Sequence, residues 1–576
     1  MSQFYDQASL VMVPSGYKNG KVYSQKPLST DGELTFTRAS NATRVGPDGL
    51  IHKVRKNLFT YSQQLDNAAW TKAVTTITAN AIVAPDGTTT ADKMADSDTT
   101  TAARYTYQAP ASSGTIYTSS GYFKKGEYNF VTLHAFGING AVFNLDTGVK
   151  VDQSGGIGSI ESVGNGWYRC SFAFTAGGTA VFFSQSPAGN ITYAGTTGSG
   201  IYAWGLQVET GDIATDYIPT TTSAVSVGPL ANIPRLNYGS DGCPSLLLEP
   251  QRSNLVTFSE SFDNAAWTKG GDVILTANYA TSPDGYQNAD RVVADTSSSG
   301  HIVYRSITTT GTHTISIFAK ASGYNYTFFG YDGGNLTFGI VFNLSNGTIS
   351  QNPSGLTGTI EAVGSDGWYR CTLTFNAPAS RYFVVSPHDN SGSYNWTGNG
   401  TDGILIYGAQ AELLSSYATS YIPTLSAAVT RGADDVSDST FTALPNANFT
   451  IFFEVNEWSG SDGNNYQVRF FDASGNRDIQ FRNRPEGWRW LIVNDAGGSA
   501  YLNTPSYTFT KMACRYNGTN YQLFADGNAV GAPFAASDTG ILDYFDSYPI
   551  GVMGIKQMLC FPTALSDTDC ETLTTL

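Results

Sequence analysis

Residues 66–72 read Asp-Asn-Ala-Ala-Trp-Thr-Lys, and residues 263–269 read the same seven letters. Two further motifs recur in the same order, namely Gly-Trp-Tyr-Arg-Cys at 166–170 and 367–371, and Tyr-Ile-Pro-Thr at 217–220 and 421–424. The spacing between matched motifs changes by only a few residues, as insertions in the loops between matching strands would cause. The middle of the chain is therefore predicted to be one domain that occurs twice.

Both copies have the residue pattern of β-strands. In residues 167–174 every second side chain is bulky and apolar or aromatic, and residues 141–145 alternate in the same way before the turn Asp-Thr-Gly. The second copy has a matching turn, Ser-Asn-Gly, after residues 341–344. A period of two, with Gly, Asp and Asn between short runs, is typical of antiparallel β-sandwiches. We expect an all-β protein.

The length of the chain indicates several domains. At 576 residues it exceeds what one hydrophobic core usually serves. The motifs divide it into an N-terminal arm (1–56), a first repeat (57–225), a connector (226–252), a second repeat (253–430) and a third sandwich (431–576). Prolines at 229, 234 and 250 favour an extended connector over a helix.

Composition excludes some classes of function. Only 14% of the residues are charged, and the net charge is −15, so nucleic-acid binding through clustered Lys and Arg is not expected. No apolar run approaches the roughly 20 residues that span a bilayer, and no membrane insertion is expected. The first residues lack the basic start and apolar run of a signal peptide, so synthesis in a bacterial cytoplasm is expected.

The cysteines and acidic loops offer little for a metal. No Cys-x-x-Cys pair occurs. Cys170 and Cys371 follow matching Trp-Tyr-Arg motifs and are predicted to be buried free thiols, whereas a bridge between Cys560 and Cys570 stays open. No cofactor is expected, except that the oxygen-rich loop at 459–465 reads either as a Ca²⁺ site or as a polar turn.

The motifs of the two repeats resemble a known group of proteins. Asn-Leu, Asp-Asn-Ala-Ala-Trp-Thr-Lys, Pro-Asp-Gly, Gly-Trp-Tyr-Arg, Gly-x-Gln-x-Glu and Tyr-Ile-Pro-Thr resemble the carbohydrate-binding-module-like jelly rolls of tailed-phage virion proteins. Residues 36–45 and 244–254 are similar to segments of phage fibre and head-decoration proteins. Residues 516–519 and 561–567 resemble a concanavalin A/laminin-G-type sandwich.

The resemblance implies a place and a role. It implies a fibre or decoration on the virion surface, either a head fibre, a capsid decoration or a tail fibre, that docks on other virion proteins through the N-terminal arm. By analogy with phage fibres, a homotrimer is expected. The jelly rolls would bind glycans of the host surface or the environment, with avidity supplied by many copies.

Aromatic residues in polar loops are the candidate glycan-binding residues. The shared Trp70, Trp267, Trp167 and Trp368, and also Trp204 and Tyr407, are interpreted as packing residues. The candidates for carbohydrate contact are Tyr193, Tyr394, Trp396, Arg484, Trp488 and Trp490. Trp and Arg also dominate protein interfaces, so packing between domains or subunits is the alternative for these loops.

No catalytic motif is present. The sequence has no Gly-x-Ser-x-Gly elbow, no His-Glu-x-x-His and no phosphate-binding glycine loop with lysine. Nothing marks two carboxylates as a glycosidase pair. The sequence therefore predicts a non-enzymatic virion protein that adheres to glycans. The alternatives are a purely structural virion component without a ligand, and a polysaccharide depolymerase tail spike.

Overall fold

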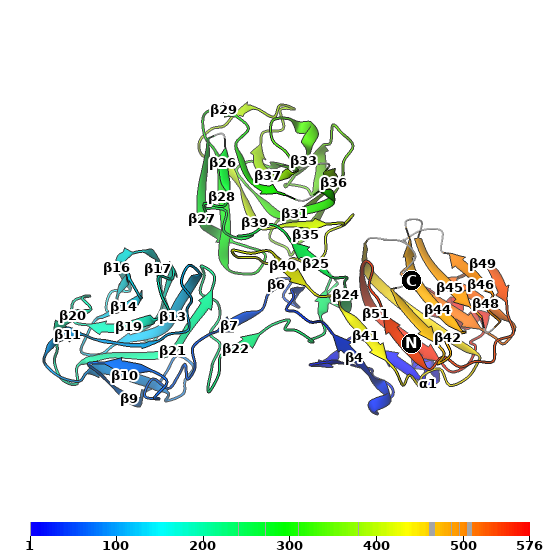
Figure 1. The fold of residues 1–576 in the computed structure, drawn as a ribbon, viewed down its shortest axis with the longest axis horizontal. Helices are drawn as coiled ribbons and strands as arrows, with labels where there is room; N and C mark the ends of the chain where they lie inside the picture. The colour runs from blue at the N-terminus through cyan, green and yellow to red at the C-terminus, as the bar shows by residue number, and fades with distance from the viewer. Residues whose placement is uncertain are drawn as a thin grey trace. The chain divides into compact units, whose positions relative to one another are not determined.

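The structure, a computed structural model, describes residues 2–239, 241–270, 272–308, 310–377, 380–459, 467–484, 487–494, 496–503 and 510–575. The regular secondary structure of this part of the chain is almost wholly antiparallel strand, which confirms the predicted all-β class of tandem sandwiches (Figure 1). It also contains the short helices α1 (Ser2–Gln7) and α2 (Asp567–Thr574) and the 3-10 turns η1 (Thr30–Gly32) and η2 (Leu336–Phe338). Neither α-helix in the described ranges has the length and hydrophobicity to cross a bilayer.

The chain folds into two compact units, one of residues 54–228 and one of residues 1–53 and 229–576. The first unit is a single sandwich, here called the first jelly roll. The second unit contains a second jelly roll, residues 252–431, and a further sandwich that we call the base sandwich. The base sandwich is assembled from three separate stretches of chain.

The first jelly roll has two six-stranded sheets with the orders β17-β18-β13-β21-β10-β9 and β16-β15-β14-β19-β12-β8, and the small ribbons β11-β20 and β7-β22. Its strands are β7 (Arg55–Asn57), β8 (Thr71–Ala73), β9 (Thr75–Ile82), β10 (Ala91–Asp96), β11 (Thr101–Ala103), β12 (Tyr105–Gln108), β13 (Ile116–Lys125), β14 (Phe130–Ala135), β15 (Ile138–Asn144), β16 (Val149–Ser154), β17 (Gly156–Gly164), β18 (Trp167–Thr175), β19 (Val181–Ser186), β20 (Thr192–Ala194), β21 (Gly200–Thr210) and β22 (Val225–Val227).

The second jelly roll repeats this topology strand for strand. Its sheets have the orders β35-β36-β31-β39-β28-β27 and β34-β33-β32-β37-β30-β26, with the ribbons β29-β38 and β25-β40. Its strands are β25 (Arg252–Asn254), β26 (Thr268–Gly270), β27 (Val273–Thr281), β28 (Gln287–Ala294), β29 (Ser298–Ser299), β30 (Ile302–Ile307), β31 (Gly311–Ser322), β32 (Tyr326–Gly330), β33 (Gly339–Asn343), β34 (Thr348–Gln351), β35 (Thr357–Val363), β36 (Trp368–Ala377), β37 (Arg381–His388), β38 (Trp396–Thr397), β39 (Gly403–Leu413) and β40 (Val429–Arg431). An identical strand order is what a duplicated domain predicts.

The repeated tryptophans have structural roles. Trp70 and Trp267 are 1% and 2% exposed and lie in the cores of their jelly rolls. Their indole N–H groups donate to the carbonyls of Tyr61 (3.0 Å) and Phe258 (2.9 Å), so burial leaves no polar atom unpaired. Trp167 and Trp368 are also buried, but they belong to smaller apolar clusters outside the two main cores. The structural interpretation of these residues is therefore correct.

The base sandwich consists of an eight-stranded sheet, β23-β24-β51-β42-β47-β48-β49 with β1 paired to β51, and a nine-stranded sheet, β2-β3-β4-β41-β50-β43-β44-β45-β46. Its strands are β1 (Leu10–Met12), β2 (Gly16–Lys18), β3 (Lys21–Tyr23), β4 (Glu33–Thr37), β23 (Leu236–Tyr238), β24 (Pro244–Leu248), β41 (Asp435–Asp438), β42 (Phe449–Ser459), β43 (Val468–Phe471), β44 (Asp478–Arg484), β45 (Gly487–Val493), β46 (Ser499–Asn503), β47 (Lys511–Tyr516), β48 (Asn520–Ala525), β49 (Asn528–Ala535), β50 (Tyr544–Ser547) and β51 (Val552–Phe561). A hairpin of β5 (Arg44–Val45) and β6 (Ile51–His52) follows β4.

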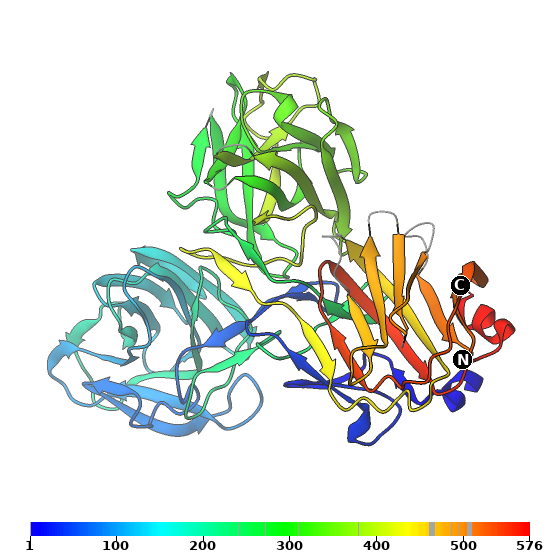
Figure 2. The same ribbon diagram turned by 45° about the vertical axis from the view of Figure 1, so that its right-hand side comes forward.

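The N-terminal segment is not a separate arm, which corrects that prediction. Strand β1 pairs with β51, and β4 pairs with β41, so residues from both ends of the chain share the same sheets. Figure 1 shows the blue β4 beside the yellow β41, and Figure 2 again places both termini on the base sandwich. The side chains of Leu10, Leu34 and Phe36 are fully buried in its core.

The connector is extended, as predicted, but its strands are built into the base sandwich. Strand β24 lies between β23 and β51 in the eight-stranded sheet, and Leu246 and Leu248 are buried in the same core. The chain therefore begins in the base sandwich, leaves it to form the first jelly roll, returns through β23 and β24, and leaves again to form the second. Each excursion starts and ends in a two-stranded ribbon, β7-β22 or β25-β40.

Buried ion pairs join the three passes of the chain through the base sandwich. Arg38 comes from the first pass, Arg235 and Glu249 from the second, and Arg431 and Asp434 from the third, and each is at most 1% exposed. Arg38 Nη1 lies 2.9 Å from Asp434 Oδ1, and Arg235 Nη1 lies 2.7 Å from Glu249 Oε2. Arg235 also pairs with Asp434, and Arg431 with Glu249. We call these five residues the ion-pair hub.

The cysteines of the described residues are all free thiols. Cys170 and Cys371 are buried, as predicted, and burial raises the pKa of each thiol. Cys560 and Cys570 are not bridged. No cluster of His, Cys, Asp and Glu suited to a metal occurs among the described residues. Most of the candidate Ca²⁺ loop at 459–465 lies outside them.

Candidate functional site

The candidate site lies on the outward face of one sheet of the second jelly roll. Along β30, Val303 and Ile307 point into the core, so Ile302 and Tyr304 point away from it. The same alternation on β37 places Phe383 and Val385 in the core, with Tyr382 and Val384 on the outward face. Because β30 and β37 are paired, these outward side chains form one surface.

This surface is hollowed into a cavity of about 370 Å³, which we call the outer-face pocket. It is lined by Gly270, Gly300, Ile302, Tyr304, Asp332, Gly333, Gly334, Tyr382, Val384 and Tyr394. The rings of Tyr304 and Tyr382 meet edge to face with their centroids 5.3 Å apart. Tyr382 is 40% exposed, so part of an aromatic side chain is open to solvent beside the cavity.

Tyr394 reaches the pocket from the loop between β37 and β38. Its ring packs edge to face against Phe328 at 5.5 Å. A Cβ atom at Gly300 would come 2.5 Å from a ring carbon of Tyr394, and one at Gly333 would come 2.9 Å from its hydroxyl oxygen. The two glycines are therefore needed for this placement of the ring. Burial raises the pKa of Tyr394, so its hydroxyl stays protonated at neutral pH.

The pocket has the features of a small binding site. Its lining is mainly apolar and aromatic, and Asp332 supplies one carboxylate, whose Oδ1 accepts the N–H of Gly333 at 2.9 Å. Aromatic walls with a few polar groups are typical of small-molecule sites. Asp332 is the sole carboxylate among the described lining residues.

Trp396 does not offer a binding face, contrary to the prediction. It is 4% exposed, and its ring packs between His301 at 4.8 Å and Tyr324 at 4.9 Å. Strand β38, which carries it, pairs with β29 in a two-stranded ribbon. Of the two aromatic residues predicted in this loop, Tyr394 lines the pocket and Trp396 lies beneath the surface.

Tyr193 is the counterpart of Trp396 in the first jelly roll, because it faces Ala102 in β11-β20 as Trp396 faces Ser299 in β29-β38. It is half-buried. Its hydroxyl donates to Asp96 Oδ1 at 2.7 Å, and the guanidinium of Arg104 lies over its ring at 5.4 Å. These contacts occupy its hydroxyl and a ring face, so Tyr193 is held within its own domain.

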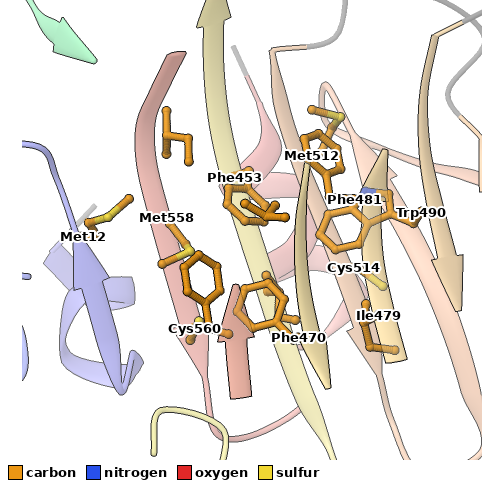
Figure 3. Close-up of a cluster of buried hydrophobic side chains, with 14 of the residues drawn as sticks. Met12, Phe453, Phe470, Ile479, Phe481, Trp490, Met512, Cys514, Met558 and Cys560 are labelled. Carbon is orange, nitrogen blue, oxygen red and sulfur yellow. The ribbon is translucent and has the colours of Figure 1, made fainter. Parts of the chain in front are cut away.

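Trp488 and Trp490 are wholly buried in the core of the base sandwich, and not exposed as a platform. Trp488 stacks on Phe481 at 4.7 Å, and Trp490 lies 6.0 Å from Phe453 (Figure 3). Both residues lie on β45, where every second side chain points to the same face of the sheet, and here that face is the core. The side chain of Arg484, the remaining candidate, lies outside the described residues.

The first jelly roll carries an aromatic surface on the equivalent sheet. The half-buried rings of Tyr105 and Tyr107 lie 5.0 and 4.9 Å from Phe182, and His134 stacks on Phe182 at 4.8 Å. Burial lowers the pKa of His134 to about 4, so its ring is neutral at pH 7. Strand pairing makes Tyr107 the counterpart of Tyr304, since they face Thr71 and Thr268.

Sequence reasoning missed Tyr304 and Tyr382. A signal was present, because Ile302–Ile307 and Tyr105–Gln108 each place an aromatic residue on the face opposite to the core residues of an alternating strand. From the sequence alone, however, either face of such a strand can be the inner one. The loops that complete the pocket gave no pattern that linked them to β30.

Comparison with known proteins gives similarity to solved structures. No protein-family model matches the chain, and no curated protein is similar to it. The N-terminal CBM22-1–CBM22-2 tandem domain from Paenibacillus barcinonensis Xyn10C matches 62% of this chain and 97% of its own, at 11% identity and a TM-score of 0.21. The binding domain of botulinum neurotoxin DC, solved in complex with rat synaptotagmin II, matches at 13% identity and a TM-score of 0.20.

The neurotoxin match covers 25% of this chain, and the chain spans about 40% of the length of that binding domain. A further match, at 12% identity and a TM-score of 0.20, is to botulinum neurotoxin type C, whose cell entry is described as dependent upon interaction with two ganglioside molecules. At these scores the likeness does not extend to function. The ligand class has to come from the side chains of the pocket.

Proposed function

We propose that this protein is a non-enzymatic adhesion protein whose second jelly roll binds glycans in the outer-face pocket. The observation that supports this proposal is an aromatic and apolar hollow on the solvent side of a sheet whose other side forms the core. Its side chains are Tyr304, Tyr382, Tyr394, Ile302 and Val384. An aromatic hollow at such a place needs a reason beyond stability. Sugar rings have apolar C–H faces that stack on tyrosines and hydroxyls that bond to carboxylates such as Asp332.

We propose further that the protein is displayed on the outside of a tailed-phage particle. This part of the proposal rests on the sequence resemblance of residues 36–45 and 244–254 to fibre and decoration proteins. Because the N-terminal strands are built into the base sandwich, we assign attachment to the particle to the base sandwich as a whole, and not to a free arm. Copies on one particle, as a homotrimer or singly, would raise the avidity of weak glycan contacts.

The test is a glycan array probed with the full chain, with and without Tyr382→Ala and Tyr394→Ala. We expect the double variant to lose about 10-fold or more in apparent affinity, since buried aromatic contacts dominate such sites. The matched control is Tyr279→Ala, a 49% exposed tyrosine on β27 in the other sheet of the same jelly roll. Equal binding by wild type and double variant would exclude the pocket, and release of new reducing ends from a bound glycan would exclude a non-enzymatic role.

A further inference from the structure

A second cavity, of about 1070 Å³, lies on the other side of the second jelly roll. It is lined by the β5-β6 hairpin, by strands β35 and β36, and by residues of the base sandwich that include Leu247, Glu249 and Val552. The loop at 416–421 also lines it. We call it the hairpin groove. It belongs to the sheet that does not carry the outer-face pocket, so the two sites share no residue.

The hairpin wall is firmly attached. Ile51 is buried among Phe318, Trp368 and Tyr407 of the second jelly roll, and its N–H donates to the carbonyl of Pro283 at 2.8 Å. Two residues further, Lys53 Nζ lies 2.7 Å from Glu260 Oε2 and 2.6 Å from Asp284 Oδ2, with its side chain 4% exposed. A wall held by a buried apolar residue and a buried ion pair gives the groove a preformed shape.

The sheet wall presents three cross-strand pairs to the groove. In the register of β35 and β36 these are Thr357 with Thr374, Thr359 with Thr372, and Glu361 with Arg370, and all six residues line the cavity. The residues between them, such as Cys371 and Leu373, point into the core. The Oγ1 atoms of Thr359 and Thr372 are 2.8 Å apart. Thr372 Oγ1 also accepts the backbone N–H of Thr359 at 3.0 Å. Because a hydroxyl donates once and accepts twice, the pair still has a donor and acceptor positions left for a ligand.

Charged groups extend the polar lining. The guanidinium of Arg370 lies over the ring of Phe318 at 5.4 Å, and its buried Nε has no hydrogen-bond partner among the described residues. The Nε of Arg44, on the hairpin side, is also buried and has no hydrogen-bond partner among the described residues. Glu361 faces Arg370 across the strands and offsets its charge. The groove therefore offers many donors and acceptors with little net charge.

We infer that the hairpin groove binds an extended, uncharged oligosaccharide chain. Rows of hydroxyls with arginine donors suit a polyhydroxyl ligand, whereas a nucleic acid would meet too few cations. Ligand sites usually measure about 300–1,000 Å³. The outer-face pocket is at the lower limit and fits the end of a glycan, while the groove is at the upper limit and fits several sugar units in a row.

The equivalent sheet face of the first jelly roll shows whether the hydroxyl and charge pattern is specific to the groove or is common to solvated faces of this fold. Ser159 pairs with Ser171, and Glu161 with Arg169, so the hydroxyl and charge pattern belongs to both repeats. The pattern by itself is therefore a property of the fold. In the second jelly roll the hairpin and residues of the base sandwich line a cavity together with this face, and so make it a groove. The inference deepens the proposed function, since both sites take glycans, but it rests on different residues.

The test is calorimetric titration of the full chain with xylo-, cello- and malto-oligosaccharides of increasing length. Affinity is expected to rise with length for wild type. The variant Thr359→Val with Thr372→Val keeps the shape of the wall and removes two hydroxyls, and should lose about 10-fold for long chains. The matched control, Ser159→Ala with Ser171→Ala, deletes the equivalent hydroxyls of the first jelly roll and should bind as wild type does.

Several results would overturn the inference. These are equal binding of long chains by wild type and the threonine variant, affinity independent of length, or binding of extended peptides to the groove in place of sugars. Tyr382→Ala with Tyr394→Ala should leave the length dependence intact, so loss of either site is seen separately. Should the threonine variant not fold, amide exchange of wild type decides, because a saturating oligosaccharide must slow exchange in residues 357–363, and no slowing refutes the groove.

Discussion

Among single residues, the repeated tryptophans Trp70 and Trp267 have the same packing role in the two jelly rolls. Trp70 contacts Phe59 at 4.9 Å, and Trp267 contacts Phe262 at 4.7 Å, with equivalent backbone partners for the indole N–H. Each ring fills the centre of a closed core. Interiors of this kind relax only partly around a deleted side chain.

We expect Trp70→Ala and Trp267→Ala each to lower the free energy of unfolding of its jelly roll by about 3–5 kcal/mol. Trp70→Phe and Trp267→Phe should cost less, since only part of the volume and one hydrogen bond are lost. Denaturant unfolding followed by circular dichroism measures the effect, with Tyr382→Ala, a 40% exposed residue, as the control. A loss below about 1 kcal/mol for either alanine variant would show that the core is not centred on these rings.

His134 makes the first jelly roll sensitive to acid. Burial lowers its pKa to about 4 from an ordinary 6.5, so the folded state takes up a proton less readily than the unfolded chain. Its contribution to stability is complete above pH 6.5 and is lost as the pH falls through 4. Asp92 acts in the opposite direction, because burial raises its pKa to about 6, which favours the fold at low pH.

The comparison that isolates His134 is therefore wild type against His134→Phe. The variant keeps the stack on Phe182 and removes the titrating group. We expect wild type to lose about 3 kcal/mol more than the variant between pH 7 and pH 4. Chemical denaturation at several pH values measures this difference, and parallel pH profiles for the two proteins would contradict the burial of a neutral imidazole.

Among the elements, the strands of residues 10–37 supply part of the base sandwich, and most of its other strands come from the last third of the chain. Four of their side chains are fully buried, namely Leu10, Val22, Leu34 and Phe36. Strand β1 pairs with β51, and β4 pairs with β41. Without them the base sandwich would expose apolar side chains and unpaired strand edges. Open edges of this kind promote aggregation.

We expect a fragment of residues 431–576 to be unfolded or aggregated, because it lacks β1–β4, β23 and β24. The fragment 54–228 is the matched control, since it holds a complete pair of sheets and its own core. It should unfold in one cooperative transition. Size-exclusion chromatography and thermal unfolding of the two fragments test this, and a stable monomeric 431–576 would show that the N-terminal strands are dispensable.

In the molecule as a whole, the ion-pair hub connects the three passes of the chain within the second unit. Burial disfavours the charge on Glu249, but Arg431 and Arg235 outweigh this effect and hold its pKa at about 2. The stabilisation from Glu249 is complete above its ordinary pKa of 4.5 and is lost as the pH falls through 2. Removal of one member leaves buried charges without compensation.

Glu249→Gln should therefore lower the stability of the second unit by about 3–5 kcal/mol. The transition of residues 54–228 should stay unchanged, because all five hub residues belong to the other unit. Differential scanning calorimetry of the full chain can separate the two transitions. Glu361→Gln, an exposed carboxylate on β35, is the control, and an equal effect of both variants would argue against the hub.

The strands, the duplication and the structural role of the shared tryptophans could all be predicted from the amino-acid order. Alternation with a period of two marks a half-buried strand wherever it occurs, and the repeated motifs around Trp70 and Trp267 mark the two copies. These are local signals. Tyr394 could also be predicted as a candidate, because an aromatic residue in a polar loop is visible in the sequence.

The pairing of the strands, and with it the buried face of each, depends on the three-dimensional fold. Backbone hydrogen bonds carry no sequence information, so nothing in Leu10–Met12 shows that it pairs with residues near 559, and the predicted arm proved to be part of a sandwich. For the same reason Trp488 and Trp490 face a core, and Tyr304 and Tyr382 face solvent. The candidate site exists because strands and loops distant in the chain meet on one sheet face.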